Sequence, residues 1–134
     1  MKVGIDFQET KRIKNEDKLL EKIALPEEVA YIQKFARSKK ERVASLWAVK
    51  EATFKALDTK AGEISFKEIE LSHKDSGAPY LKLFGKAKKR FETLGKQIEV
   101  SISHQKSGVV AIVIILWFLK NCLRHRLWRF FILA

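Results

Sequence analysis

Residues 42–58, RVASLWAVKEATFKALD, constrain the fold of this chain more than any other segment. At about 100° per residue, a helix there places bulky apolar side chains on one stripe and small ones on a second ridge. The stripe consists of Val43, Leu46, Trp47, Phe54 and Leu57, and the ridge of Ala44, Ala48, Ala52 and Ala56. Because a ridge of alanines lets another backbone approach closely, the sequence predicts one long interior helix.

Three charged residues interrupt this apolar helix. Lys50 projects into the stripe itself, and Glu51 and Lys55 lie at its flank, one turn apart. Burying an unpaired charge costs several kcal/mol. As a solvated ion pair, Glu51 and Lys55 would contribute only about 0.3–0.5 kcal/mol. Two interpretations therefore stay open at this point, an exposed helix face and a functional site.

The remaining apolar pattern predicts short strands and helices around this core. Strands are predicted at residues 3–7, 64–71, 80–84, 97–103 and 109–116, and further helices at residues 11–23, 26–35 and 85–94. The turn at residues 73–79 joins two strands into a hairpin. The last strand is wholly apolar, which is typical of a central strand covered on both faces. We expect an α+β fold, a single domain in which a small antiparallel sheet packs against the long buried helix.

The charge and the cysteine content narrow the classes of partner and of metal site that this chain can have. The net charge is +11, from 27 Lys and Arg against 16 Asp and Glu. This balance favours a polyanionic partner, namely nucleic acid, an acidic membrane face, an acidic protein or a phosphate-rich small molecule. Cys122 is the sole cysteine, which excludes an internal disulfide and a cysteine-based metal site. The first residues contain no apolar signal segment, so we expect a cytoplasmic protein.

Polar residues at the ends of predicted strands and on the interior helix are the candidates for chemistry. Asp6 ends the first strand, Glu51 and Lys55 lie on the helix, and His104 follows a strand. Two carboxylates suit Mg²⁺, which is often bound by one or two carboxylates plus substrate phosphates. Lysines supply charge for the same phosphates. By residue type alone, a lone histidine such as His104 is more often a surface or structural residue than a functional one.

Four sequence blocks, in order, resemble the holo-acyl-carrier-protein synthases, the small bacterial type of phosphopantetheinyl transferase. They are GIDFQETKRI at residues 4–13, WAVKEATFKAL at 47–57, GAPYLKL at 77–83 and SISH at 101–104. The resemblance implies an enzyme that transfers the 4′-phosphopantetheine group of coenzyme A to a serine of apo-acyl carrier protein. It also implies a role in fatty acid biosynthesis and a homotrimer with each site at a subunit boundary.

The resemblance also implies a role for individual residues. Asp6, Glu51 and Lys55 would be catalytic, with Asp6 and Glu51 binding Mg²⁺ and Lys55 lying beside the diphosphate. The implied coenzyme A-binding residues are Lys50, Lys55, Gly77, Pro79, Ser103 and His104, and Arg12 would face the acidic helix of the carrier protein. The chain departs from the family pattern at two positions, because Leu46 stands where the family usually has arginine and Ala78 where it usually has lysine.

The sequence also predicts a division of the chain at residue 116. Residues 1–116 are predicted to form the transferase domain, and residues 117–134 a basic and apolar extension without a catalytic role. The apolar run at 109–119 is shorter than the about 20 residues of a spanning helix, although residues 123–134 suit a membrane surface.

One alternative function is a module that binds nucleic acid or a membrane surface without catalysis. The chain has no interleaved aromatic and glycine motif for RNA, and its short length argues against a second alternative, a transferase for carriers of secondary metabolism.

Overall fold

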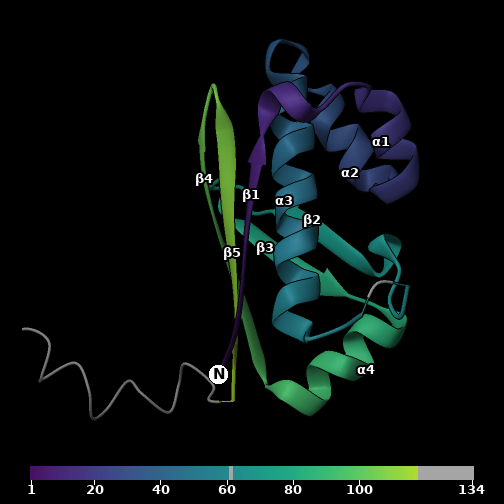
Figure 1. The fold of residues 1–134 in the computed structure, drawn as a ribbon, viewed down its shortest axis with the longest axis vertical. Helices are drawn as coiled ribbons and strands as arrows, with labels where there is room; N and C mark the ends of the chain where they lie inside the picture. Colours follow the sequence, from purple (N-terminus) through teal and green to yellow (C-terminus); the bar gives the residue numbers. More distant parts are fainter. Residues whose placement is uncertain (61, 118–134) are drawn as a thin grey trace, which may run out of the picture.

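The computed structural model describes residues 1–60 and 62–117 and contains two antiparallel sheets and one long helix (Figure 1). The strands are β1 (Lys2–Glu9), β2 (Ile69–His73), β3 (Pro79–Leu83), β4 (Gln97–Gln105) and β5 (Gly108–Leu116). The helices are α1 (Glu16–Ile23), α2 (Pro26–Gln33), α3 (Lys39–Leu57) and α4 (Gly85–Leu94), with short 3-10 turns η1 (Thr10–Arg12), η2 (Ala36–Ser38) and η3 (Phe66–Glu68). The order of strands is β1-β5-β4 in one sheet and β2-β3 in the other. The fold is therefore α+β, as predicted.

Helix α3 is the centre of the core. The three-stranded sheet covers one side of it, and α1 and α2 lie on the other (Figure 1). Its alanine ridge faces β1, where Gly4 lies so close that a side chain there would overlap the Ala52 carbonyl and the Ala56 amide. The predicted close approach of a backbone to the ridge is thus confirmed, and it requires glycine at position 4.

Strand β5 is central in its sheet, as predicted, but only one of its faces is covered within the chain. Val109, Ala111, Val113 and Ile115 are fully buried against α3. The opposite face, which we name the outer sheet face, exposes Val3, Ile5 and Phe7 of β1 and Val110 of β5. Phe7 alone is 60% exposed. The expectation of a strand covered on both faces is wrong for the single chain.

Local capping explains why the strand predicted at residues 64–71 begins later. The Ser65 side chain accepts a hydrogen bond from the Lys67 amide, and the Glu68 carboxylate accepts one from the Ser65 amide. This reciprocal capping closes the 3-10 turn η3, and β2 starts only at Ile69. The hairpin then forms its own sheet instead of joining the larger one. The helix predicted at residues 11–23 likewise divides into η1 and α1, and α2 ends at Gln33, short of Phe35.

Among residues 1–60 and 62–117, none of the helices has the length and apolar character that crossing a membrane requires. Residues 118–134, which make up almost all of the predicted carboxyl-terminal extension, lie outside the described residues.

Candidate active site

Asp6 and Glu51 line the same cavity. Asp6 comes from the middle of β1 and Glu51 from the third quarter of α3, two elements that pack along their whole length. Arg12 of η1 and Trp47 of α3 lie on the wall of this carboxylate cavity. The side chain of Asp6 is only 14% exposed. Residues 45 positions apart in the sequence thus present two carboxylates to one space.

Lys55 pairs with Asp6 rather than standing free on a helix face. Its Nζ atom donates to Asp6 Oδ1 at 2.7 Å and to the carbonyl oxygen of Ile5 at 2.9 Å. The Lys55 side chain is about half exposed, so it can reach an anion in the solvent without leaving the site. Of the two interpretations of this helix face, the structure favours the site, because the lysine bridges from α3 to the middle of β1. Asp6 does not end the first strand, as the sequence predicted, because β1 continues to Glu9.

The electrostatics of the carboxylate cavity suit a cation. Burial raises the pKa of Glu51, the neighbouring Asp6 raises it further, and Lys55 and Lys22 oppose the shift. A divalent cation between the carboxylates would relieve their repulsion. Among the described residues no group of three or more His, Cys, Asp and Glu side chains could by itself hold a metal ion, so a metal bound here would need further oxygen ligands from substrate and water, as Mg²⁺ commonly does. The donor set fits that ion.

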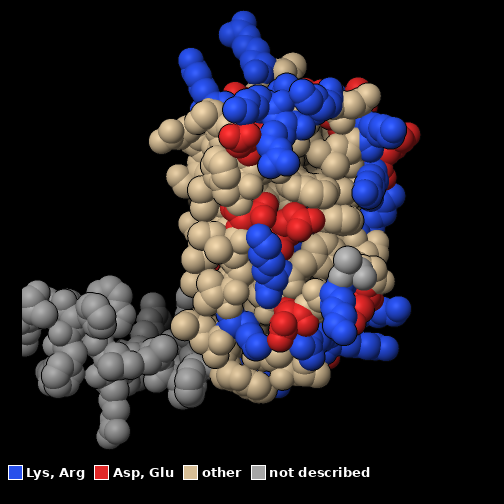
Figure 2. Space-filling model, in the orientation of Figure 1, with Lys and Arg blue, Asp and Glu red and all other residues tan. Residues whose placement is uncertain are grey.

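Figure 2 shows how charged side chains are distributed over one face of the molecule. A small acidic cluster lies in the middle of the view, and Lys and Arg side chains gather above and below it. An acidic spot inside a basic surface can hold a cation while the surroundings attract anions.

Lys50 is buried in the core and does not face a ligand site, although the resemblance implies that it binds coenzyme A. Its side chain is fully buried, and its ammonium donates to the Ile23 carbonyl at 2.7 Å, to Glu28 Oε2 at 2.8 Å and to the Phe66 carbonyl at 3.0 Å. Burial lowers the pKa of Lys50, and the Glu28 carboxylate opposes that shift. An ammonium group has three N–H donors, so none remains for a phosphate, and the role of Lys50 is structural.

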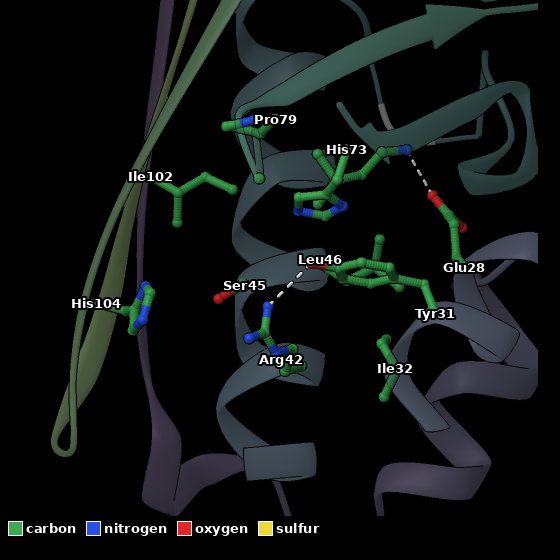
Figure 3. Close-up of a pocket in the computed structure, with 12 residues that line it drawn as sticks. Glu28, Tyr31, Ile32, Arg42, Ser45, Leu46, His73, Pro79, Ile102 and His104 are labelled. Atoms are coloured by element: carbon green, nitrogen blue, oxygen red, sulfur yellow. Dashed lines mark hydrogen bonds between the residues drawn. The ribbon is translucent and has the colours of Figure 1, made fainter. Parts of the chain in front are cut away.

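A second pocket, which we name the hairpin pocket, contains three of the other predicted coenzyme A-binding residues (Figure 3). Gly77 and Pro79 come from the β2–β3 hairpin and His104 from β4, and all three line it. Gly77 has φ +84°, a conformation that side chains disfavour, and its amide donates to the Lys74 carbonyl to close the turn. Leu46, at the position of the family arginine, is buried in the wall of this pocket.

Ser103 does not share the hairpin pocket with His104. Neighbouring residues of a strand point to opposite faces. His104 is paired with the buried Val109, whereas Ser103 is paired with Val110 on the outer sheet face. The structure therefore separates these two predicted residues within one chain.

Sequence reasoning missed three residues of the hairpin pocket. Tyr31 of α2 stacks on His73 of β2, with ring centroids 4.1 Å apart and 7° between the planes. Arg42 of α3 donates from Nη1 to the Tyr31 hydroxyl at 3.3 Å. The sequence did carry one signal, because Arg42 lies one helical turn before Leu46 and so faces the same way.

The carboxylate cavity and the hairpin pocket lie on different sides of α3. Arg42 and Glu51 are nine residues apart, which is about two and a half turns. Their side chains consequently leave the helix in opposite directions. A ligand that touched both places on one chain would have to pass around the helix.

Comparisons with known proteins cover the residues of both the carboxylate cavity and the hairpin pocket. A profile described as the 4′-phosphopantetheinyl transferase superfamily matches residues 2–113. The holo-[acyl-carrier-protein] synthase of Maridesulfovibrio salexigens is 38% identical over 120 residues, covering 84% of this chain and 95% of that protein. The structure of the Helicobacter pylori holo-[acyl-carrier-protein] synthase in complex with coenzyme A gives a TM-score of 0.73 at 29% identity, covering 84% of this chain and 98% of that one. The Bacillus anthracis synthase, in complex with CoA (3′,5′-ADP), gives a TM-score of 0.72 at 34% identity over 85% and 94%.

Proposed function

The chain belongs to the 4′-phosphopantetheinyl transferase superfamily, and from that membership we propose its reaction and the residues that perform it. The enzyme transfers the 4′-phosphopantetheine group of coenzyme A to a serine of apo-acyl carrier protein, the activity named for its relatives. The observation that carries the proposal is the shared cavity of Asp6 and Glu51, with Lys55 hydrogen-bonded to Asp6. We propose that this activity serves fatty acid biosynthesis in the cytoplasm.

The residues of the carboxylate cavity can account for each part of the transfer. The serine hydroxyl of the carrier attacks the β-phosphorus of coenzyme A, a P–O bond to serine forms, and the bridging P–O bond breaks to release adenosine 3′,5′-bisphosphate. The serine proton passes to Glu51, directly or through a water held by Glu51 or Asp6, and the raised pKa of Glu51 suits a general base. Lys55 places its charge beside the diphosphate.

Asp6 and Glu51 would hold Mg²⁺ in this site. The ion supplies neutralisation of the charge on the diphosphate oxygens. Arg12, exposed on the wall of the same cavity, is placed to meet an acidic carrier protein, and the net charge of +11 favours its approach. The attacking nucleophile belongs to the carrier, which is why the cavity needs no activated serine or cysteine of its own.

We propose that the complete site lies between two subunits of a homotrimer. In this arrangement the carboxylate cavity of one subunit faces the hairpin pocket of the next, so coenzyme A need not pass around α3. Support comes from the outer sheet face, which exposes Val3, Ile5, Phe7 and Val110 together. Contiguous apolar residues of this kind are typical of an interaction surface. Ser103, on the same face, would lie at the boundary.

Introducing a charge on the outer sheet face is expected to dissociate the oligomer. Val3→Asp and Val110→Asp place a carboxylate on positions that are 48% and 38% exposed in the single chain, so the subunit still folds. Light scattering after gel filtration should show the mass of one chain, and transfer activity should be lost. Val3→Thr, which keeps the side-chain shape, serves as the control. A wild-type mass of one chain, or an active monomeric variant, would contradict the proposal.

The direct test of function is a mass measurement on the carrier. The purified chain, coenzyme A, MgCl₂ and apo-acyl carrier protein are mixed, and mass spectrometry should find phosphopantetheine added to the carrier serine. Omitting Mg²⁺ with a chelator present should prevent the addition. If the wild-type chain adds no mass where a control synthase does, the proposed function is wrong.

We further propose that residues 1–116 form the transferase domain, in line with the family match at residues 2–113, and that residues 117–134 form an extension without a catalytic role.

A further inference from the structure

Lys55 already occupies one of the two carboxylates of the carboxylate cavity. Its ammonium lies 2.7 Å from Asp6 Oδ1 and 2.9 Å from the Ile5 carbonyl oxygen, so two of its three N–H donors are used. Glu51, one helical turn before Lys55, lines the same cavity as Asp6. Within the part of the chain that the structure describes, the Glu51 carboxylate has no hydrogen bond or ion pair. One acid of the cavity thus has a counter-ion and the other does not.

A divalent cation cannot simply be added to this arrangement. Between Asp6 and Glu51 it would lie next to the Lys55 ammonium, since that ammonium contacts Asp6 directly. Like charges repel strongly over such short distances where little water screens them, and the Asp6 side chain is only 14% exposed. The ammonium can withdraw, because the Lys55 side chain is 52% exposed and its four-carbon stem is flexible. Lys55 and Glu51 also line a neighbouring cavity, with Thr59 and Lys60, into which the ammonium can turn.

We propose that Lys55 is a built-in counter-ion, which weakens the binding of divalent cations in the carboxylate cavity until an anionic substrate draws its ammonium away from Asp6. This inference rests on the proposed function. A diphosphate offers the displaced ammonium a new partner and offers the cation further oxygen ligands. Metal and substrate consequently bind cooperatively, and each raises the affinity for the other by the same factor. Lys55 therefore couples the two binding events, in addition to placing its charge beside the diphosphate.

Calorimetric titration of the full chain with MgCl₂ alone tests this inference without coenzyme A. Lys55→Met keeps an unbranched stem and removes the ammonium, so it should bind Mg²⁺ about 5- to 150-fold more tightly than the wild type, the usual range for coupled sites. Lys55→Arg keeps the charge and should bind Mg²⁺ as weakly as the wild type. Lys22→Met is the matched control, because Lys22 is exposed and its charge acts on Glu51 less than that of Lys55 does. Within the described residues Lys22 pairs with neither acid of the cavity, so its loss should change the affinity little.

Repeating the titration with coenzyme A present, after subtracting a blank of coenzyme A without protein, measures the coupling. In the wild type, coenzyme A should lower the dissociation constant of Mg²⁺, because the diphosphate draws the ammonium away from Asp6. In Lys55→Met the same addition should lower it by a smaller factor, since no ammonium has to be displaced. Lys55→Met should nevertheless transfer phosphopantetheine more slowly, because the diphosphate has lost its lysine. Tighter metal binding combined with slower transfer is not expected of a lysine that only stabilises the fold.

Three outcomes would overturn the inference: Lys55→Met binds Mg²⁺ no more tightly than the wild type, Lys22→Met or Lys55→Arg tightens binding as much as Lys55→Met does, or coenzyme A lowers the dissociation constant by the same factor in the wild type and Lys55→Met. If Lys55→Met does not fold, as judged by its thermal unfolding, Lys55→Gln replaces it. Transfer by the wild type without an effect of Lys55→Met on Mg²⁺ binding would reject only the counter-ion. A lack of transfer by the wild type, with tighter Mg²⁺ binding by Lys55→Met, would reject only the function.

Discussion

Asp6→Asn and Glu51→Gln should each lower the turnover of the transfer reaction by about 10²- to 10⁴-fold while the chain stays folded. Each substitution keeps the shape of the side chain and removes one of the two negative charges of the carboxylate cavity. In the proposed site the cation would then lose a ligand, and in Glu51→Gln the serine proton would lose its acceptor. Asp6→Asn also removes the negative charge of the ion pair with Lys55 Nζ, which lies 2.7 Å from Asp6 Oδ1, although the amide oxygen can still accept a hydrogen bond.

Single-turnover rates and a Mg²⁺ titration measure this prediction. Both variants should need more Mg²⁺ for half-maximal activity, since the metal has lost one carboxylate. Glu92→Gln, an exposed acid on α4 outside the cavity, is the matched control and should behave as the wild type does. Wild-type turnover in either variant at low Mg²⁺ would remove that residue from the metal site.

The long helix was predictable because its signal is local and periodic. The alanines of α3 recur every four residues, and that spacing alone predicted a close neighbour, which proves to be β1 at Gly4. The partner itself was not predictable, since the pairing of β1 with the ridge depends on contacts far apart in the chain. The same limit applies to Asp6 and Glu51. The resemblance implied that they share one site, whereas their spacing in the sequence could not predict it.

Two errors have physical causes that lie outside local patterns. Alternation predicted a strand from Ile64, but the capping of Ser65 by Glu68 favours a 3-10 turn over extended backbone. The apolar run of β5 predicted cover on both faces, whereas a single chain covers one. The second discrepancy is informative, because it points to the outer sheet face as the surface that needs a neighbour.

Lys50 and the hairpin pocket show how a family resemblance can mislead about a binding residue. The resemblance implies that Lys50 binds coenzyme A, but the lysine is paired with Glu28, which lies 22 positions earlier in the sequence. Arg42 closes the basic run at residues 37–42, so its sequence context does not single it out. Only the packing of Tyr31 and Phe35 against Arg42 distinguishes it from that run.

Breaking the buried ion pair of Lys50 and Glu28 should cost about 3–5 kcal/mol of the free energy of unfolding. The two side chains are 0% and 2% exposed. Glu28 also accepts hydrogen bonds from the amides of Leu25, at the start of α2, and Leu71, in β2. One carboxylate thus connects two elements to α3, and neither partner can be replaced by water at this depth.

Single and double variants distinguish the free energy that the Lys50–Glu28 pair contributes from the effects of its surroundings. Lys50→Met leaves a buried carboxylate without its counter-charge, and Glu28→Gln leaves a buried ammonium, so each should show the full loss. The double variant Lys50→Met/Glu28→Gln buries no net charge and should lose less than the sum of the two. Lys39→Met breaks the exposed pair with Asp17 and should cost at most about 1 kcal/mol.

Chemical denaturation at one fixed protein concentration measures these differences, because an oligomer gains stability with concentration. Additive losses in the double variant would show that the two charges do not act as a pair.

The buried pair also bears on catalysis, since Glu51 follows Lys50 directly on α3. Lys50 anchors this turn of α3 to the Ile23 carbonyl, Glu28 and the Phe66 carbonyl, and the next residue, Glu51, lines one cavity with Asp6. A variant that folds but has lost this anchor should therefore bind Mg²⁺ more weakly than the wild type.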